Sequence, residues 1–122
     1  MFFINLKKIL KGSALIITRP QDIEFPFFDK ALEVFAERQI SDVDLIKNIE
    51  ASGLKVSRQI KKIKISLNKN KMINMVENRF MSTFSQFSDQ ELLIGINEMK
   101  EKYKDFSNLV FNDKLIFIKL TQ

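Results

Sequence analysis

Residues 6–20 read LKKILKGSALIITRP, the pattern of the end of an amphipathic helix, a tight turn and a short strand. Lysines mix with aliphatic residues before Gly12, and the strand that follows, residues 14–18, is almost wholly apolar. A strand that is apolar on both faces normally lies inside a sheet, with other strands on each side. This one follows Met1 so closely that few strands can precede it, and we therefore expect one of its edges to be unpaired.

The rest of the chain alternates between helical and strand patterns. Apolar side chains recur every three or four residues in four segments, which predicts about four helices, over residues 27–39, 41–52, 69–81 and 88–104. Ser41 is placed to cap the second helix, and Ser88 with Glu91 forms a capping box for the fourth. We predict an α/β fold in a single domain over residues 1–122, with a sheet of about three strands, at residues 14–18, 54–67 and 114–120.

The long strand changes its buried face part of the way along. Val56 and Ile60 share one parity, whereas Ile63 and Ile65 share the other. Successive side chains of a strand point to opposite faces, so a single buried face would require an extra residue. We therefore expect a bulge or a strong bend near Lys61–Lys62.

Composition removes several classes of chemistry. The chain contains no Cys and no His, which excludes disulfides, thiol nucleophiles, imidazole metal ligands and histidine acid–base catalysis. We therefore predict no metal site. No apolar run approaches the ~20 residues that a helix needs to cross a bilayer, so we expect no membrane partner and a cytoplasmic location.

The charge of the chain suggests nucleic acid as one class of partner. The net charge is +5, from 20 basic and 15 acidic residues, and the densest basic cluster covers residues 58–71. Acidic and basic residues are nevertheless mixed along the chain, and the cluster contains no aromatic side chain on which bases could stack. We do not expect nucleic-acid binding.

Four segments, taken in order, resemble parts of the C-terminal half of the class I S-adenosylmethionine-dependent methyltransferases. LKKILKGSALIITRP is similar to that family's helix, Lys-Pro-Gly-Gly turn and fifth strand, and DVDLIKNIEASGLKV (residues 42–56) to the helix leading into its sixth strand. NRFMSTFSQFSDQELLIGINEMKEKYKD (residues 78–105) resembles a helical insertion of small-molecule methyltransferases, and FNDKLIFIKL (residues 111–120) resembles the seventh strand. The resemblance implies an incomplete Rossmann-like sheet whose last strand runs antiparallel between the other two.

The chain departs from this family in two places. The Pro-Gly-Gly turn is replaced by Gly12-Ser13-Ala14. In the family a glycine-rich loop after the first strand approaches S-adenosylmethionine, but the three glycines here, Gly12, Gly53 and Gly95, lie in no G-x-G pattern. The resemblance therefore implies S-adenosylmethionine as the cofactor of an intact relative. The resemblance also implies that this chain alone does not bind the cofactor, because none of the four similar segments corresponds to the family's strands one to four.

The same resemblance places candidate contacts for a substrate. Ligands of open α/β sheets bind beyond the carboxyl ends of the strands, where Arg19 and Gln21 follow the opening strand. Arg79, Thr83 and Phe84 lie in the insertion, which is expected to form a lid over this opening. Each has an alternative role: a solvated loop arginine, a helix or turn cap, or a core aromatic. We assign no catalytic and no cofactor-binding residue.

Three functions remain open from the sequence, and the weakest of them is a basic nucleic-acid binder that uses residues 58–71. In the first, the chain is the substrate-side half of a small-molecule methyltransferase. It is then inactive alone, and acts on a methyl acceptor only when a separate N-terminal half supplies the cofactor site. In the second, it is a non-enzymatic interaction module whose opening strand pairs with a partner strand, or with a second copy in a homodimer. Whether the chain is an enzyme is left undecided.

Overall fold

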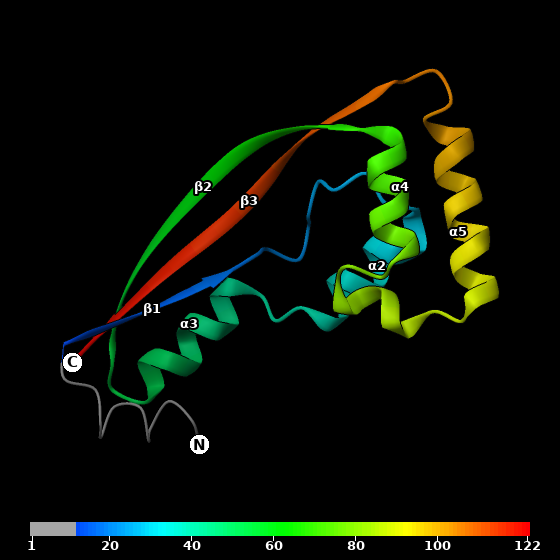
Figure 1. Ribbon diagram of the computed structural model, residues 1–122. Helices are drawn as coiled ribbons and strands as arrows, with labels where there is room; N and C mark the ends of the chain where they lie inside the picture. The colour runs from blue at the N-terminus through cyan, green and yellow to red at the C-terminus, as the bar shows by residue number, and fades with distance from the viewer. Residues whose placement is uncertain (1–11) are drawn as a thin grey trace. The chain divides into compact units, whose positions relative to one another are not determined.

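The computed structural model describes residues 12–122 of the chain (Figure 1). The helix end predicted before Gly12 lies outside the described residues. The described part contains four α-helices, one short 3-10 helix and three strands, in the order β1 (Ser13–Thr18), α2 (Asp29–Arg38), α3 (Asp42–Ala51), β2 (Lys55–Asn68), α4 (Lys69–Glu77), η1 (Ser82–Gln86), α5 (Asp89–Lys102) and β3 (Asn108–Thr121). The predicted α/β class, with about three strands and four helices, is confirmed for these residues.

The three strands form one sheet in the order β1-β3-β2. β1 pairs with β3 in antiparallel register, from Ser13 opposite Thr121 to Thr18 opposite Ile116. β2 and β3 run in opposite directions (Figure 1), and the Lys69 N–H at the end of β2 donates a hydrogen bond of 2.9 Å to the Ser107 carbonyl, just before β3. The last strand therefore lies in the middle of the sheet, and β1 is an edge strand within the described part of the chain, as the sequence predicts.

β3 is longer than the sequence indicates. It begins at Asn108, whereas the predicted strand begins at residue 114. Leu109 and Phe111 are buried and alternate with the exposed Val110, which is the period of a strand. The polar pair Asn112 and Asp113 follows directly and hides this alternation, because such residues usually mark a turn.

The described chain divides into two compact units, each with its own core. The first comprises the described residues up to Gln21, with Gln39–Ile63 and Lys114–Gln122; the second comprises Asp22–Arg38 and Lys64–Asp113. In the first unit α3 packs on the sheet, and the buried residues are Ile49, Leu54, Ile116, Ile118 and Leu120. The second core is rich in phenylalanine and is built mainly from α2, α4, η1 and α5. The prediction of one domain over residues 1–122 stays a prediction.

The two cores explain why the strands change their buried face. Val56 of β2 packs in the core of the first unit, whereas Ile65 and Leu67, of the other parity, pack in the core of the second. β3 makes the same change, with Leu109 and Phe111 in the second core and the even-numbered residues 116, 118 and 120 in the first. The expected change of face in β2 is confirmed, and the bulge near Lys61–Lys62 stays a prediction.

Helix α5 is placed by its start and by a close contact in its middle. Ser88 and Glu91 form the predicted capping box at its N-terminus. Gly95 lies under the ring of Phe28, and a Cβ atom built at Gly95 would come within 2.6 Å of three atoms of that ring. Phe28 is itself buried and packs on Phe87, with ring centroids 5.2 Å apart. Only glycine therefore lets α5 approach Phe28 this closely.

We predict that Gly95→Ala destabilises the protein. In an exposed helix the same change would stabilise by about 1 kcal/mol, but here the added methyl group must displace a buried ring, which costs about 1–3 kcal/mol. Urea denaturation followed by circular dichroism measures the difference. Asn97→Ala, at an exposed position of α5, is the matched control and should be neutral or slightly stabilising. Equal stabilisation by both substitutions would contradict the Phe28 contact.

Candidate functional site

The first two predicted site residues, Arg19 and Gln21, lie together in the first unit. The side-chain amide of Gln39 donates to Thr18 Oγ1 at 2.9 Å and to the Arg19 carbonyl at 2.7 Å. Gln21 Nε2 donates in turn to the Gln39 carbonyl at 3.0 Å. These bonds hold the loop after β1 through the Arg19 carbonyl and through the side chains of Thr18 and Gln21. Sequence reasoning missed Gln39, because no local pattern links it to a loop about 20 residues earlier.

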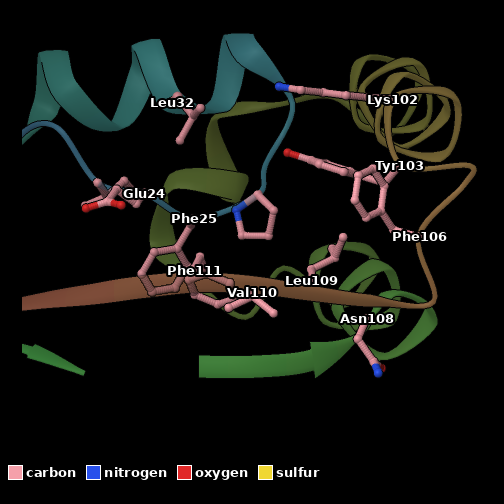
Figure 2. A pocket seen from close by; sticks show the side chains of 12 residues that line it. Glu24, Phe25, Leu32, Lys102, Tyr103, Phe106, Asn108, Leu109, Val110 and Phe111 are labelled. Atoms are coloured by element: carbon pink, nitrogen blue, oxygen red, sulfur yellow. The ribbon is translucent and has the colours of Figure 1, made fainter. Parts of the chain in front are cut away.

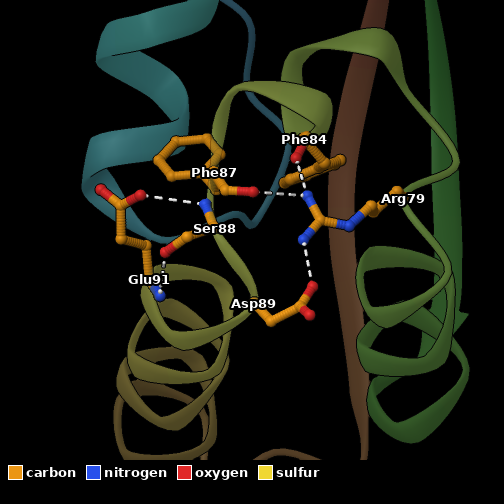
Figure 3. Close-up of polar contacts among 6 residues, drawn as sticks. All are labelled: Arg79, Phe84, Phe87, Ser88, Asp89 and Glu91. Carbon is orange, nitrogen blue, oxygen red and sulfur yellow. Dashed lines mark hydrogen bonds and ion pairs between the residues drawn. The ribbon is translucent and has the colours of Figure 1, made fainter.

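The other three candidates, Arg79, Thr83 and Phe84, lie together in the second unit. Arg79 follows α4 with a φ of 52°, in the left-handed region that residues other than glycine rarely adopt. Its guanidinium donates to the carbonyls of Phe84 and Phe87, and it pairs with Asp89 Oδ1 at 3.0 Å (Figure 3). One cation therefore satisfies two backbone acceptors of the η1 segment and binds a carboxylate at the start of α5.

Thr83 and Phe84 are buried within this segment. The side chain of Phe84 is fully buried, and its ring packs edge-on against Phe27 with centroids 5.0 Å apart. Thr83 is also buried, with 5% of its surface exposed. The structure thus brings Arg79, Thr83 and Phe84 together in positions that organise η1. Substrate contact by these residues, and by Arg19 and Gln21, stays a prediction.

The capping box beside Arg79 changes the acidity of Glu91. The Ser88 N–H donates to Glu91 Oε1 at 2.9 Å, and the Glu91 N–H donates to Ser88 Oγ at 3.1 Å (Figure 3). The hydrogen bond from the Ser88 backbone, followed by that from its side chain, lowers the pKa of Glu91 below its ordinary value of 4.5. The ionised form of Glu91 is therefore bound more favourably in the folded state than in the unfolded state.

A pocket of about 440 Å³ lies in the second unit, where β2 ends and β3 begins (Figure 2). Its lining comes from the segment before α2, from the end of α5 and from the first residues of β3. The side chains are mainly apolar, with four polar ones among them: Ile23, Glu24, Phe25, Pro26, Leu32, Lys102, Tyr103, Phe106, Asn108, Leu109, Val110 and Phe111. The pocket lies against the first residues of β3, which run beside the last residues of β2.

Two aromatic pairs form walls of this pocket. The rings of Phe25 and Phe111 have centroids 5.0 Å apart and planes inclined by 49°. The rings of Tyr103 and Phe106 have centroids 6.2 Å apart and meet edge to face at 74°. Figure 2 shows the Tyr103 hydroxyl pointing away from Phe106, toward the side of the pocket where Leu32 lies.

One ammonium and two carboxylates lie at this pocket. Lys102 Nζ lies 5.5 Å from the centre of the Tyr103 ring and 3.7 Å from Asp29 Oδ1. Glu24 adds a further carboxylate to the lining. From the sequence, Tyr103 is placed only within the predicted helix of residues 88–104. The pocket has no local signal, because its two contributing stretches, residues 23–32 and 102–111, meet only in the folded chain. The only sequence feature that could have indicated this pocket is the presence of two aromatic residues, Tyr103 and Phe106, just after a helix.

The chain matches no protein-family model, and no curated protein sequence matches it. Among residues 12–122, no group of three or more Asp or Glu side chains is placed to hold a metal ion. In the same residues no helix is both long enough and apolar enough to span a membrane.

The three glycines all lie within the described residues, and none of them is part of a loop that follows a strand. Gly12, with a φ of 117°, precedes β1, and Gly53, with a φ of 90°, precedes β2. Gly95 lies inside α5 against Phe28. None of these glycines follows a strand, as a phosphate- or cofactor-binding loop requires.

We predict that Glu91 makes stability depend on pH. Its pKa is lower in the folded state, so its contribution is present above the unfolded pKa and is lost as the pH falls through the folded pKa. Glu91→Gln should therefore reduce the free energy of unfolding more at pH 7 than at pH 3, as measured by urea denaturation. Glu98→Gln, at an exposed position of the same helix, controls for removing one charge. An equal loss at both pH values for Glu91→Gln would show that the carboxylate is not specifically bound.

Proposed function

We propose that this chain forms the acceptor side of a class I methyltransferase sheet, and that further strands from outside these residues pair along β1. The strand order supports this proposal most directly. β3 lies antiparallel between β1 and β2, the arrangement that the resemblance implies for the family's fifth, seventh and sixth strands. In such a sheet the fifth strand, which β1 resembles, pairs on its other side with the fourth strand. The fourth strand would therefore pair with the outer edge of β1.

The two edges of the sheet differ in a way that favours growth along β1. β2 carries five basic side chains, at Lys55, Arg58, Lys61, Lys62 and Lys64. Charges of this kind, lysine above all, discourage a second strand from pairing with an edge. β1, with the sequence SALIIT, carries no charge at all. Within residues 12–122, one edge is therefore protected against strand addition, and the other has neither a charged side chain nor a neighbouring strand.

One face of the sheet in the first unit is also incompletely covered. Leu15 and Ile17 of β1 expose 58% and 55% of their surfaces. Ile17 lies opposite Phe117 in the register, so their side chains share a face, and Lys61 Nζ lies 5.2 Å from the centre of the Phe117 ring. The opposite face is packed on α3 through Ile49. Exposed apolar surface of this kind marks an interaction site.

In this proposal the added strands hold the cofactor, and the present chain holds the methyl acceptor. The pocket at the start of β3 is the candidate acceptor site, because its lining is mainly apolar and its volume suits a small molecule. Alignment of acceptor and donor supplies much of the acceleration in reactions of this kind. The absence of Cys and His from the sequence is therefore compatible with an acceptor-side role.

The test is to purify the tagged chain from the cells that encode it. The purified complex should bind S-adenosylmethionine in a calorimetric titration, whereas the chain expressed alone should not. Ile17→Lys should abolish both complex formation and cofactor binding, because it places a charge on the exposed face of β1. That position is more than half exposed, so the free energy of unfolding should change by only about 0.5 kcal/mol.

Ile60→Lys is the matched control, since Ile60 is a comparably exposed isoleucine on the other edge strand. It should leave the complex intact. Saturable binding of S-adenosylmethionine by the isolated chain would overturn the proposal, and so would a complex that binds none.

The alternative function is a non-enzymatic interaction module. The charge-free edge of β1 favours it, because strand addition needs only free backbone groups and suits a second copy of this chain equally well. Light scattering across a dilution series separates the two functions. A dimer that dissociates on dilution, is lost in Ile17→Lys and has no affinity for S-adenosylmethionine would support the module and reject the methyltransferase role.

A further inference from the structure

We infer that the pocket at the start of β3 binds a small, neutral aromatic compound that carries one oxygen substituent, with Tyr103 as its hydrogen-bond partner. The inference goes beyond the proposed function, because binding here needs neither an added strand nor a cofactor. All twelve lining residues belong to the second unit, so the site is complete within it.

The size of the pocket and the nature of its lining suit a small molecule. Its volume of about 440 Å³ lies within the range of roughly 300–1,000 Å³ that is usual for ligand sites. Eight of its twelve lining residues are Ile, Leu, Val, Phe or Pro. A surface of this composition gains most by contact with an apolar body of similar size.

The aromatic walls favour a flat ring over a saturated one. Phe25 and Phe111 form one wall, and Tyr103 and Phe106 form another (Figure 2). Aromatic rings attract each other in tilted and edge-to-face arrangements, beyond the contribution of the area that they bury. A planar ligand in this pocket can make such contacts with both pairs.

Tyr103 supplies the polar contact. Within residues 12–122 its hydroxyl makes no hydrogen bond, although the residue is partly buried, and Figure 2 shows the hydroxyl directed into the pocket. A hydroxyl of this kind is best satisfied by an oxygen on the ligand, to which it can donate or from which it can accept. A ligand without such an oxygen would leave it unpaired.

The surrounding charges favour a neutral ligand over an anion. The ammonium of Lys102 is engaged by Asp29 and by the ring of Tyr103. Glu24, in the lining, adds a negative charge. A carboxylate on the ligand would lie near the acidic groups Asp29 and Glu24 and would compete with Asp29 for Lys102, whereas a hydroxyl or ketone would not.

The chain offers a reporter for this site, because Tyr103 is its only tyrosine. Incorporation of 3-fluorotyrosine gives a single ¹⁹F signal, at the wall of the pocket. We use 2-naphthol as the probe, with 2-naphthoate as the charged analogue and decahydro-2-naphthol as the saturated one. The signal should move saturably with 2-naphthol, and both analogues should bind at least about fivefold more weakly.

Variants followed by calorimetry identify the contacts. Tyr103→Phe keeps the aromatic wall and should weaken 2-naphthol about fivefold, the value of one ordinary hydrogen bond, while leaving the affinity for naphthalene unchanged. Phe106→Ala should weaken both ligands. Leu93→Ala is the matched control: Leu93 is 57% exposed, close to the 55% of Phe106, and does not line the pocket.

Three outcomes would overturn the inference. The first is the absence of any saturable shift with 2-naphthol at millimolar concentration. The second is equal binding of 2-naphthol and its saturated analogue, which would mean that the site binds apolar molecules without a preference for aromatic rings. The third is binding that Phe106→Ala leaves intact. Phe106 is mostly exposed, so this variant should fold, and its circular dichroism spectrum checks that it does. The proposed function fails separately, on cofactor binding by the complex.

Discussion

The antiparallel pairing of β1 with β3 is the interaction on which the rest of the structure depends. It places six residues of β1 against the last residues of β3, from Ser13 opposite Thr121 to Thr18 opposite Ile116. It therefore makes the last strand the middle of the sheet and leaves one edge of β1 without a neighbour in the described chain. The same register places Ile17 beside Phe117 on the exposed face. The proposed partner strands, and the side from which they approach, both follow from this pairing.

Local chemistry accounts for the features that the sequence predicts well. Ser41 and Ser88 accept hydrogen bonds from the first turns of α3 and α5, and these bonds involve residues three apart in the chain. Gly53 ends α3 with a positive φ, which glycine adopts at least cost. Strand order is not local information, and it entered the sequence analysis only through a family resemblance.

Features that depend on distant contacts could not be predicted. The early start of β3 becomes clear only when Leu109 and Phe111 are seen in the phenylalanine-rich core. The change of buried face in β2 could be predicted from the sequence. Its cause, the presence of two separate cores, could not be predicted. Among the candidate site residues, Arg79 proved to bind backbone carbonyls of the next segment. The pocket around Tyr103 joins two stretches that are far apart in sequence, residues 23–32 and residues 102–111.

The central claim is that β1 is an edge prepared for strand addition, and residue-resolved amide hydrogen exchange on the isolated chain tests it most directly. In an antiparallel pair, alternate amides of each strand point toward the partner strand, and the others point away. We predict that slow and fast exchange alternate along Ser13–Thr18, with the fast amides lying on the open edge. Slow exchange at all six positions in a monomeric chain would mean that both edges are already paired, and would contradict the account.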